Sequence, residues 1–154
     1  MRRGLHWVAL TAIVVGFAGC RAKSTGAETG AESPELAVHQ FLSAARAQDL
    51  QAMSSVWGNE TSPVRDRVGR QELEQRLIII ACHLRHDDAR LDVAQRAPEG
   101  RTLLRADLTQ GTKTAAVNFL TIRNTRSGRW FVDDIDLRPV REFCSSRPRS
   151  SSGA

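Results

Sequence analysis

The spacing of apolar residues changes once along this chain, and that change constrains the fold more than any other feature. Before His86-Asp87-Asp88 the apolar side chains recur about every 3.6 residues, the period of a helix with one buried face. After this point they alternate with polar residues, the period of a strand with one buried face. Helices followed by strands indicate an α+β fold, with the helices packed on one face of an antiparallel sheet.

Three helices are expected in the first part of this domain. Ser33-Pro34-Glu35 is a strong helix start, because serine caps free amides, proline suits the first position and glutamate suits the positive end of the dipole. Asp49 is expected to cap a short second helix. The third is predicted over roughly 70–85, and we expect it to be the most buried helix, with Ile78 and Ile79 broadening its apolar face.

Four antiparallel strands in a meander are expected after the change of period. Turn residues at 98–100, 110–112 and 124–128 separate the alternating segments. The last two strands are predicted over 114–123 and 129–138. A short terminal segment then reaches Cys144.

The first twenty residues are predicted to be an export signal. Arg2 and Arg3 are followed by residues 4–19, which contain no Lys, Arg, Asp or Glu. A helix of that length rises about 24 Å, short of the roughly 30 Å that a membrane-spanning helix must cross. A charged start, a short apolar body and a small-residue end are typical of a secretory signal.

The end of that segment, Phe17-Ala18-Gly19-Cys20, resembles the bacterial lipobox, although phenylalanine replaces the commoner leucine. The resemblance implies cleavage after Gly19, acylation of Cys20 and a place in the bacterial cell envelope. Arg21 is not the aspartate that retains enterobacterial lipoproteins in the inner membrane, so the periplasmic face of the outer membrane is favoured. The alternatives are an uncleaved anchor or an ordinary secretory signal followed by a chance cysteine.

Composition divides the rest of the chain. After the signal, 1–19, the lipidated cysteine and a polar tether are expected over 20–32, the folded domain over 33–144 and a disordered tail over 145–154. The formal charge of +5 belongs mostly to the ends, because the domain itself holds sixteen Lys and Arg against fifteen Asp and Glu. These bases are interleaved with acids, which argues against a nucleic-acid-binding protein.

The order of elements resembles the nuclear-transport-factor-like and ketosteroid-isomerase-like superfamily. The opening SPELAVHQFLSAARAQDLQAMSSVW, residues 33–57, is similar to its usual start, and the ending GRWFVDDIDL, residues 128–137, is similar to its last strand. The resemblance implies a cone in which three N-terminal helices pack on a curved four-stranded antiparallel sheet. It implies no particular activity, since this fold supports unrelated functions.

Two cysteines remain if Cys20 is lipidated, and an exported protein meets an oxidising compartment. In the cone fold Cys82 and Cys144 belong to elements that can meet, so a disulfide is expected; two buried free thiols are the alternative. A zinc site is a further possibility, because Cys82 and His86 are four residues apart on a helix, with His83 one residue off that face. Cys144 would supply a third ligand.

An acidic cluster on the last strand is the remaining candidate site. Asp133 is predicted to share a face with apolar residues, and enzymes of the resembled superfamily place acids or histidines inside the cone. Asp133 with His83 or His39 is therefore a candidate acid–base pair. The alternatives are an aspartate paired with arginine, or calcium binding together with Asp134 and Asp136.

No signature of a hydrolase, phosphate-binding loop, dinucleotide fold or zinc protease occurs in the sequence. We therefore expect a lipid-anchored binding or interaction domain without catalysis and without a cofactor, and keep a small acid–base enzyme as the alternative. The expected partners are the membrane and either a small apolar ligand inside the cone or an envelope protein on the outer sheet face. A homodimer through the sheet is implied by the resemblance alone.

Overall fold

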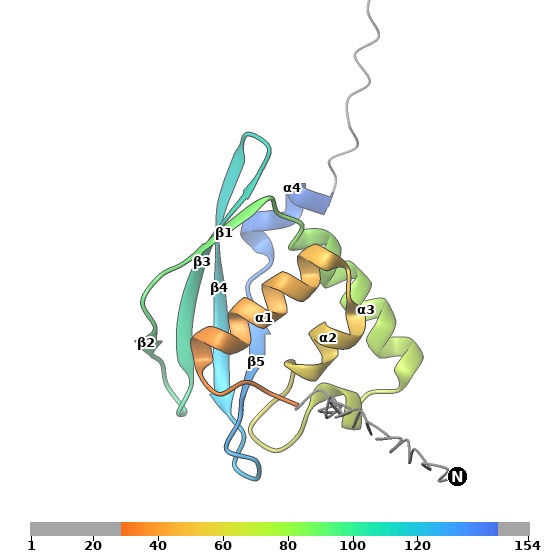
Figure 1. Ribbon diagram of the computed structural model, residues 1–154, viewed down its shortest axis with the longest axis vertical. Coiled ribbons are helices and arrows are strands. Elements are labelled where there is room, and N and C mark those ends of the chain that lie inside the picture. The colour runs from red at the N-terminus through yellow and green to blue at the C-terminus, as the bar shows by residue number, and fades with distance from the viewer. Residues whose placement is uncertain (1–28, 145–154) are drawn as a thin grey trace, which may run out of the picture.

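The computed structural model describes residues 29–144, in which helices pack against one face of an antiparallel sheet (Figure 1). The predicted α+β class is confirmed, but there are four α-helices rather than three and the sheet has five strands rather than four. The elements are α1 (Pro34–Ala47), α2 (Leu50–Ser55), η1 (Val64–Asp66), α3 (Arg70–His83), β1 (Asp88–Leu91), β2 (Gln95–Arg96), β3 (Thr102–Gln110), β4 (Lys113–Arg123), β5 (Trp130–Ile135), η2 (Arg138–Val140) and α4 (Arg141–Cys144).

The first two helices begin at the caps that the sequence predicts. The Ser33 hydroxyl accepts a hydrogen bond from the Leu36 amide at 3.1 Å, and the Asp49 carboxylate accepts one from the Ala52 amide at 2.9 Å. Each bond satisfies an amide that has no partner within its own helix. Gln48 ends α1 in the left-handed conformation, with φ of 57°, so the chain turns sharply into α2.

The sheet runs in the order β1-β3-β4-β5, and β2 lies beside β1 on the same edge of β3. The first predicted strand is thus divided in two, because β1 pairs with the second half of β3 and β2 with Thr102 and Leu103. Between them Val93 is 86% exposed. The alternation of apolar residues therefore predicts a strand in this segment, but it does not predict where the backbone pairing with β3 is interrupted.

Strand β5 contains one extra residue, which changes the faces predicted for its side chains. Val132 pairs with Thr121 and Asp134 pairs with the preceding residue Leu120, so Asp133 is left without a partner across the ladder. An extra residue of this kind reverses the alternation beyond it. Val132 consequently lies in the apolar core, and Ile135, three residues further on, packs against the same core.

Helix α3 is not the most buried helix, contrary to the prediction. It buries Leu73, Leu77 and Ala81, whereas α1 buries six residues. Ile78 and Ile79 are 56% and 58% exposed, so they lie outside the apolar face that they were expected to broaden. A run of three isoleucines covers more than half of a helix circumference, and only packing decides which of them is buried.

The packed domain includes residues that were predicted to belong to the tether. The amide of Gly30 donates to the carbonyl of Ser55 at 2.7 Å, and Ala31 exchanges two backbone hydrogen bonds with Trp130. Both Gly30 and Ala31 are buried. The described residues do not include the predicted signal, Cys20 or the predicted tail over 145–154. Within the described residues no helix is long and apolar enough to span a bilayer.

Candidate functional site

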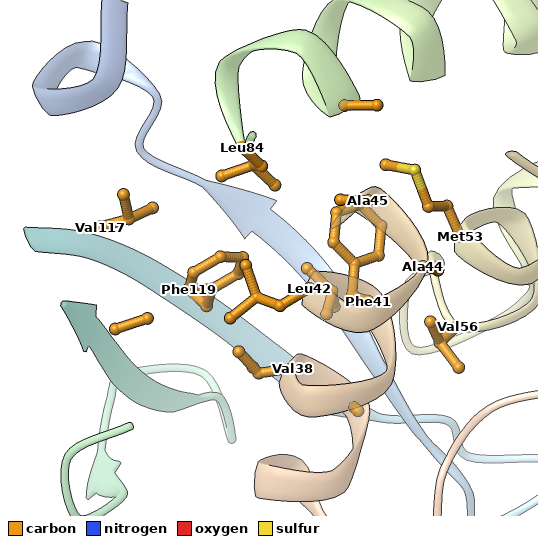
Figure 2. Close-up of a cluster of buried hydrophobic side chains, with 14 of the residues drawn as sticks. Val38, Phe41, Leu42, Ala44, Ala45, Met53, Val56, Leu84, Val117 and Phe119 are labelled. Carbon is orange, nitrogen blue, oxygen red and sulfur yellow. The ribbon is translucent and has the colours of Figure 1, made fainter. Parts of the chain in front are cut away.

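The space between the helices and the sheet is filled by the side chains of the protein itself. Leu42 on α1 points toward Phe119 on β4, and the ring of Phe41 lies on the other side, between Ala45 and Met53 (Figure 2). Phe41, Phe119 and Leu84 have no exposed surface, and Leu42 is 3% exposed. The interior that was expected to offer an apolar pocket is therefore occupied by close-packed core.

Asp133 is held by an arginine rather than by a histidine. The Nε of Arg101 donates to Oδ2 of Asp133 at 2.8 Å, and the same guanidinium also bonds Glu99. The hydrogen bond that Arg101 donates to Asp133, with a smaller contribution from the bond to Glu99, raises the pKa of Arg101 above its usual value. Asp133 and Arg101 thus form a structural ion pair. This is the arginine-paired aspartate that the sequence offered as the alternative to an acid–base site.

The two candidate histidines lie on other elements. His83, at the end of α3, has Nδ1 3.3 Å from the carbonyl oxygen of Val140. His39 is exposed on α1. Within residues 29–144 neither histidine forms a hydrogen bond or ion pair with Asp133. The structure therefore does not assemble the proposed acid–base pair.

Cys82 and Cys144 form a disulfide, with their Cα atoms 4.9 Å apart. The bridge joins the last turn of α3 to α4 and closes a loop of 62 residues. The bridge engages both of the cysteine sulfurs that the zinc hypothesis would use as ligands. His86 has Nδ1 2.7 Å from the Leu84 carbonyl oxygen, and the described residues hold no group of three potential metal ligands.

The three aspartates near the end of β5 do not converge on a cation. Asp133 is paired with Arg101, and Asp136 accepts two hydrogen bonds of 2.8 Å from the guanidinium of Arg138. These bonds from Arg138 are the main cause of a lowered pKa at Asp136. Asp134 is exposed. Each carboxylate thus has a separate environment, which does not fit a shared calcium site.

A surface groove of about 610 Å³ lies instead between α1 and α2. Alanines form much of its floor because their side chains are too short to fill the angle between the two helices. Polar side chains line its rim. The lining residues include His39, Ser43, Ala44, Ala47, Ala52 and Ser55, and Gly30 and Arg129 lie at one end.

Arg129 is fixed at that end of the groove. Its Nε and Nη2 donate to the Gly30 carbonyl at 3.2 and 2.9 Å, and Nη1 lies 3.8 Å from Glu32. Gly30 has φ of +83°, and a Cβ there would lie 2.7 Å from the Cβ of Arg129. Only glycine allows this close approach, so the backbone itself forms part of the rim.

The groove has the size and mixed lining of a binding site, with an apolar floor and a few polar groups. The alanines and serines of this groove lie in the segment SAARAQDLQA, residues 43–52, and the sequence alone does not predict a groove there. Comparisons of the chain with known protein families and with curated proteins find no match.

Proposed function

We propose that this protein is a lipid-anchored, non-catalytic binding domain of the bacterial cell envelope. In this proposal residues 1–19 direct export, Cys20 carries the acyl chains, and the domain recognises a partner or small ligand through the groove between α1 and α2. Two or three acyl chains hold a protein stably on a membrane, where one chain would not. The periplasmic face of the outer membrane is the favoured location.

The observation that carries the proposal is the division of the three cysteines. Cys82 and Cys144 are joined across the fold, which fits an oxidising compartment outside the cytoplasm. The third, Cys20, directly follows the uncharged segment 4–19 and ends the sequence Phe17-Ala18-Gly19-Cys20. Export and lipidation together account for all three positions.

The second part of the proposal is the absence of catalysis, and two features support it. The filled interior leaves no room for a substrate where an acid–base enzyme of the resembled superfamily would bind one. Asp133, the candidate base, is paired with Arg101 instead. We also infer membership of the nuclear-transport-factor-like superfamily, which is supported by the order of α1, α2 and α3 before an antiparallel sheet.

The proposal is tested by labelling cells that express the full chain with radioactive or alkyne-tagged palmitate and then separating their membranes. We expect label in the wild type, none in Cys20→Ala, and unchanged label in the matched control that replaces Cys82 and Cys144 with serine. Label in the outer-membrane fraction supports the location. An unlabelled wild type, or equal label in Cys20→Ala, would refute the anchor.

A further inference from the structure

Four arginines at one end of the domain lack carboxylate partners. Arg65 and Arg67 lie in and just after η1, and Arg123 and Arg126 flank the turn between β4 and β5. All four are exposed, and within residues 29–144 none forms an ion pair. We call this group the basic end.

Hydrogen bonds hold the two segments of the basic end together. The Thr125 amide donates to the Glu60 carbonyl at 2.8 Å, and the Asn124 side chain donates to the Asn59 carbonyl at 3.3 Å. Figure 1 shows the β4–β5 turn, η1 and the first described residues at the same, lower end of the molecule. The backbone segments that carry these arginines are therefore held at the same end of the domain.

The chain enters the domain at this end. Arg65 donates a side-chain hydrogen bond to the hydroxyl of Thr29, the first described residue. Cys20 precedes Thr29 by only nine positions in the chain, and even fully extended this segment reaches about 30 Å. A compact domain of about a hundred residues has a radius of gyration of about 13 Å and hence a diameter of about 35 Å.

That comparison determines which end of the domain can meet the membrane. Arg46, Arg85 and Arg141 also lack ion pairs in the described structure, at the opposite end, so charge alone does not select an orientation. If the opposite end lay on the bilayer, Thr29 would be about 35 Å from the membrane surface. The segment from Cys20 to Thr29 cannot reach that far. The basic end stays within reach.

From this geometry, and resting on the proposed anchor at Cys20, we infer that Arg65, Arg67, Arg123 and Arg126 bind anionic phospholipid headgroups and orient the domain on its membrane. Glu35, Glu60 and Asp66 are exposed carboxylates near this end for which the described structure shows no ion pair, so the four arginines still leave an excess of positive charge. Each arginine near an anionic surface strengthens binding by about fivefold, and the contact weakens as salt screens it.

Arginine footprinting of the full chain, purified from membranes and reconstituted in vesicles, tests this contact. Phenylglyoxal labelling is mapped by mass spectrometry in phosphatidylcholine vesicles with and without 30% phosphatidylglycerol. We expect the four basic-end arginines to be labelled at least about fivefold more slowly with the anionic lipid, with the protection lost in high salt. Arg46, Arg85 and Arg141 serve as internal controls whose rates should not change. Equal rates in both lipids, or equal protection of both groups, would overturn the inference.

A pair of charge-matched variants gives a second readout. One variant replaces Arg65, Arg67 and Arg126 with glutamine, and the other replaces Arg46, Arg85 and Arg141 with glutamine. Anionic vesicles should slow amide hydrogen exchange of residues 59–67 in the wild type and in the second variant, but not in the first. Loss of this protection in both variants would contradict the contact. The mass of Cys20 in the same sample reports the anchor separately. If Cys20 is unacylated, the proposed anchor is refuted. In that case the protein is mixed with anionic vesicles, and unchanged phenylglyoxal labelling of the basic-end arginines would overturn the lipid contact as well.

Discussion

Removing the disulfide gives the most quantitative prediction about the stability of this domain. The bridge ties α4 to α3, and the neighbouring Val140 and Phe143 are 0% and 3% exposed. Replacing Cys82 and Cys144 with serine leaves those apolar contacts in place. The main effect is therefore on the unfolded chain, which regains the freedom that the bridge had restricted.

The size of that effect follows from the loop of 62 residues. In the chain-entropy relation, removing a bridge that closes such a loop lowers the free energy of unfolding by about 4 kcal/mol at 25 °C. This is a large share of the 5–15 kcal/mol that stabilises an ordinary domain. For a domain of this size the melting temperature should fall by roughly 15 °C.

Equilibrium unfolding in urea, followed by tryptophan fluorescence, measures the loss directly. The single variants Cys82→Ser and Cys144→Ser are the matched controls, and each should lose as much as the double variant because the bridge needs both residues. A loss below about 1 kcal/mol in the double variant would refute the reasoning. Alkylation of two thiols in the exported wild type without reductant would refute the bridge itself.

Three further changes probe the core, the rim and a surface ion pair. Phe119→Ala should lower the free energy of unfolding by about 3–5 kcal/mol in urea, since this side chain has no exposed surface; a loss under about 1 kcal/mol would contradict a filled interior. Gly30→Ala should cost more than about 2 kcal/mol, because its Cβ would lie 2.7 Å from a neighbouring Cβ, whereas Gly111→Ala, with nothing within 4 Å, should cost only about 1 kcal/mol; equal losses would show that the close approach is unimportant. Asp136→Asn should lower the melting temperature near neutral pH, where Arg138 stabilises the ionised carboxylate and lowers its pKa, and the difference from wild type should vanish as pH falls below about 4 and through that lowered pKa. A difference that persists at pH 2 would exclude the ion pair as its cause.

The starts of the helices and the class of the fold could be predicted because they depend on local chemistry. Ser33 and Asp49 act as caps through bonds to amides three residues away. The change from a helical to a strand period likewise needs no information beyond a short window of sequence. Such features survive packing because the finished fold reinforces the same local preferences.

The arrangement around Asp133 could not be predicted, for two physical reasons. Counting alternate residues along a strand assumes regular pairing, and the extra residue at Asp133 breaks it. Its partner Arg101 is 32 residues away, and nothing local selects it from the other arginines. The exposure of Ile78 and Ile79 depends in the same way on how α3 is rotated against its neighbours.

The groove between α1 and α2 has a different origin. It exists because short side chains such as Ala47 and Ala52 meet where two helices diverge. Alanine is common in any helix, so its presence does not distinguish a hollow surface from a packed one. Only the angle between the helices, set by Gln48 and the Asp49 cap, turns these residues into a groove.

The identity of the mature N-terminus tests the central claim most directly. The protein is purified from the membranes of its host, digested, and its N-terminal peptide is sequenced by mass spectrometry. A lipid-anchored envelope protein predicts a peptide that begins at Cys20 and carries a diacylglycerol on the thiol. A peptide that begins at Met1, or an unmodified Cys20, would contradict it.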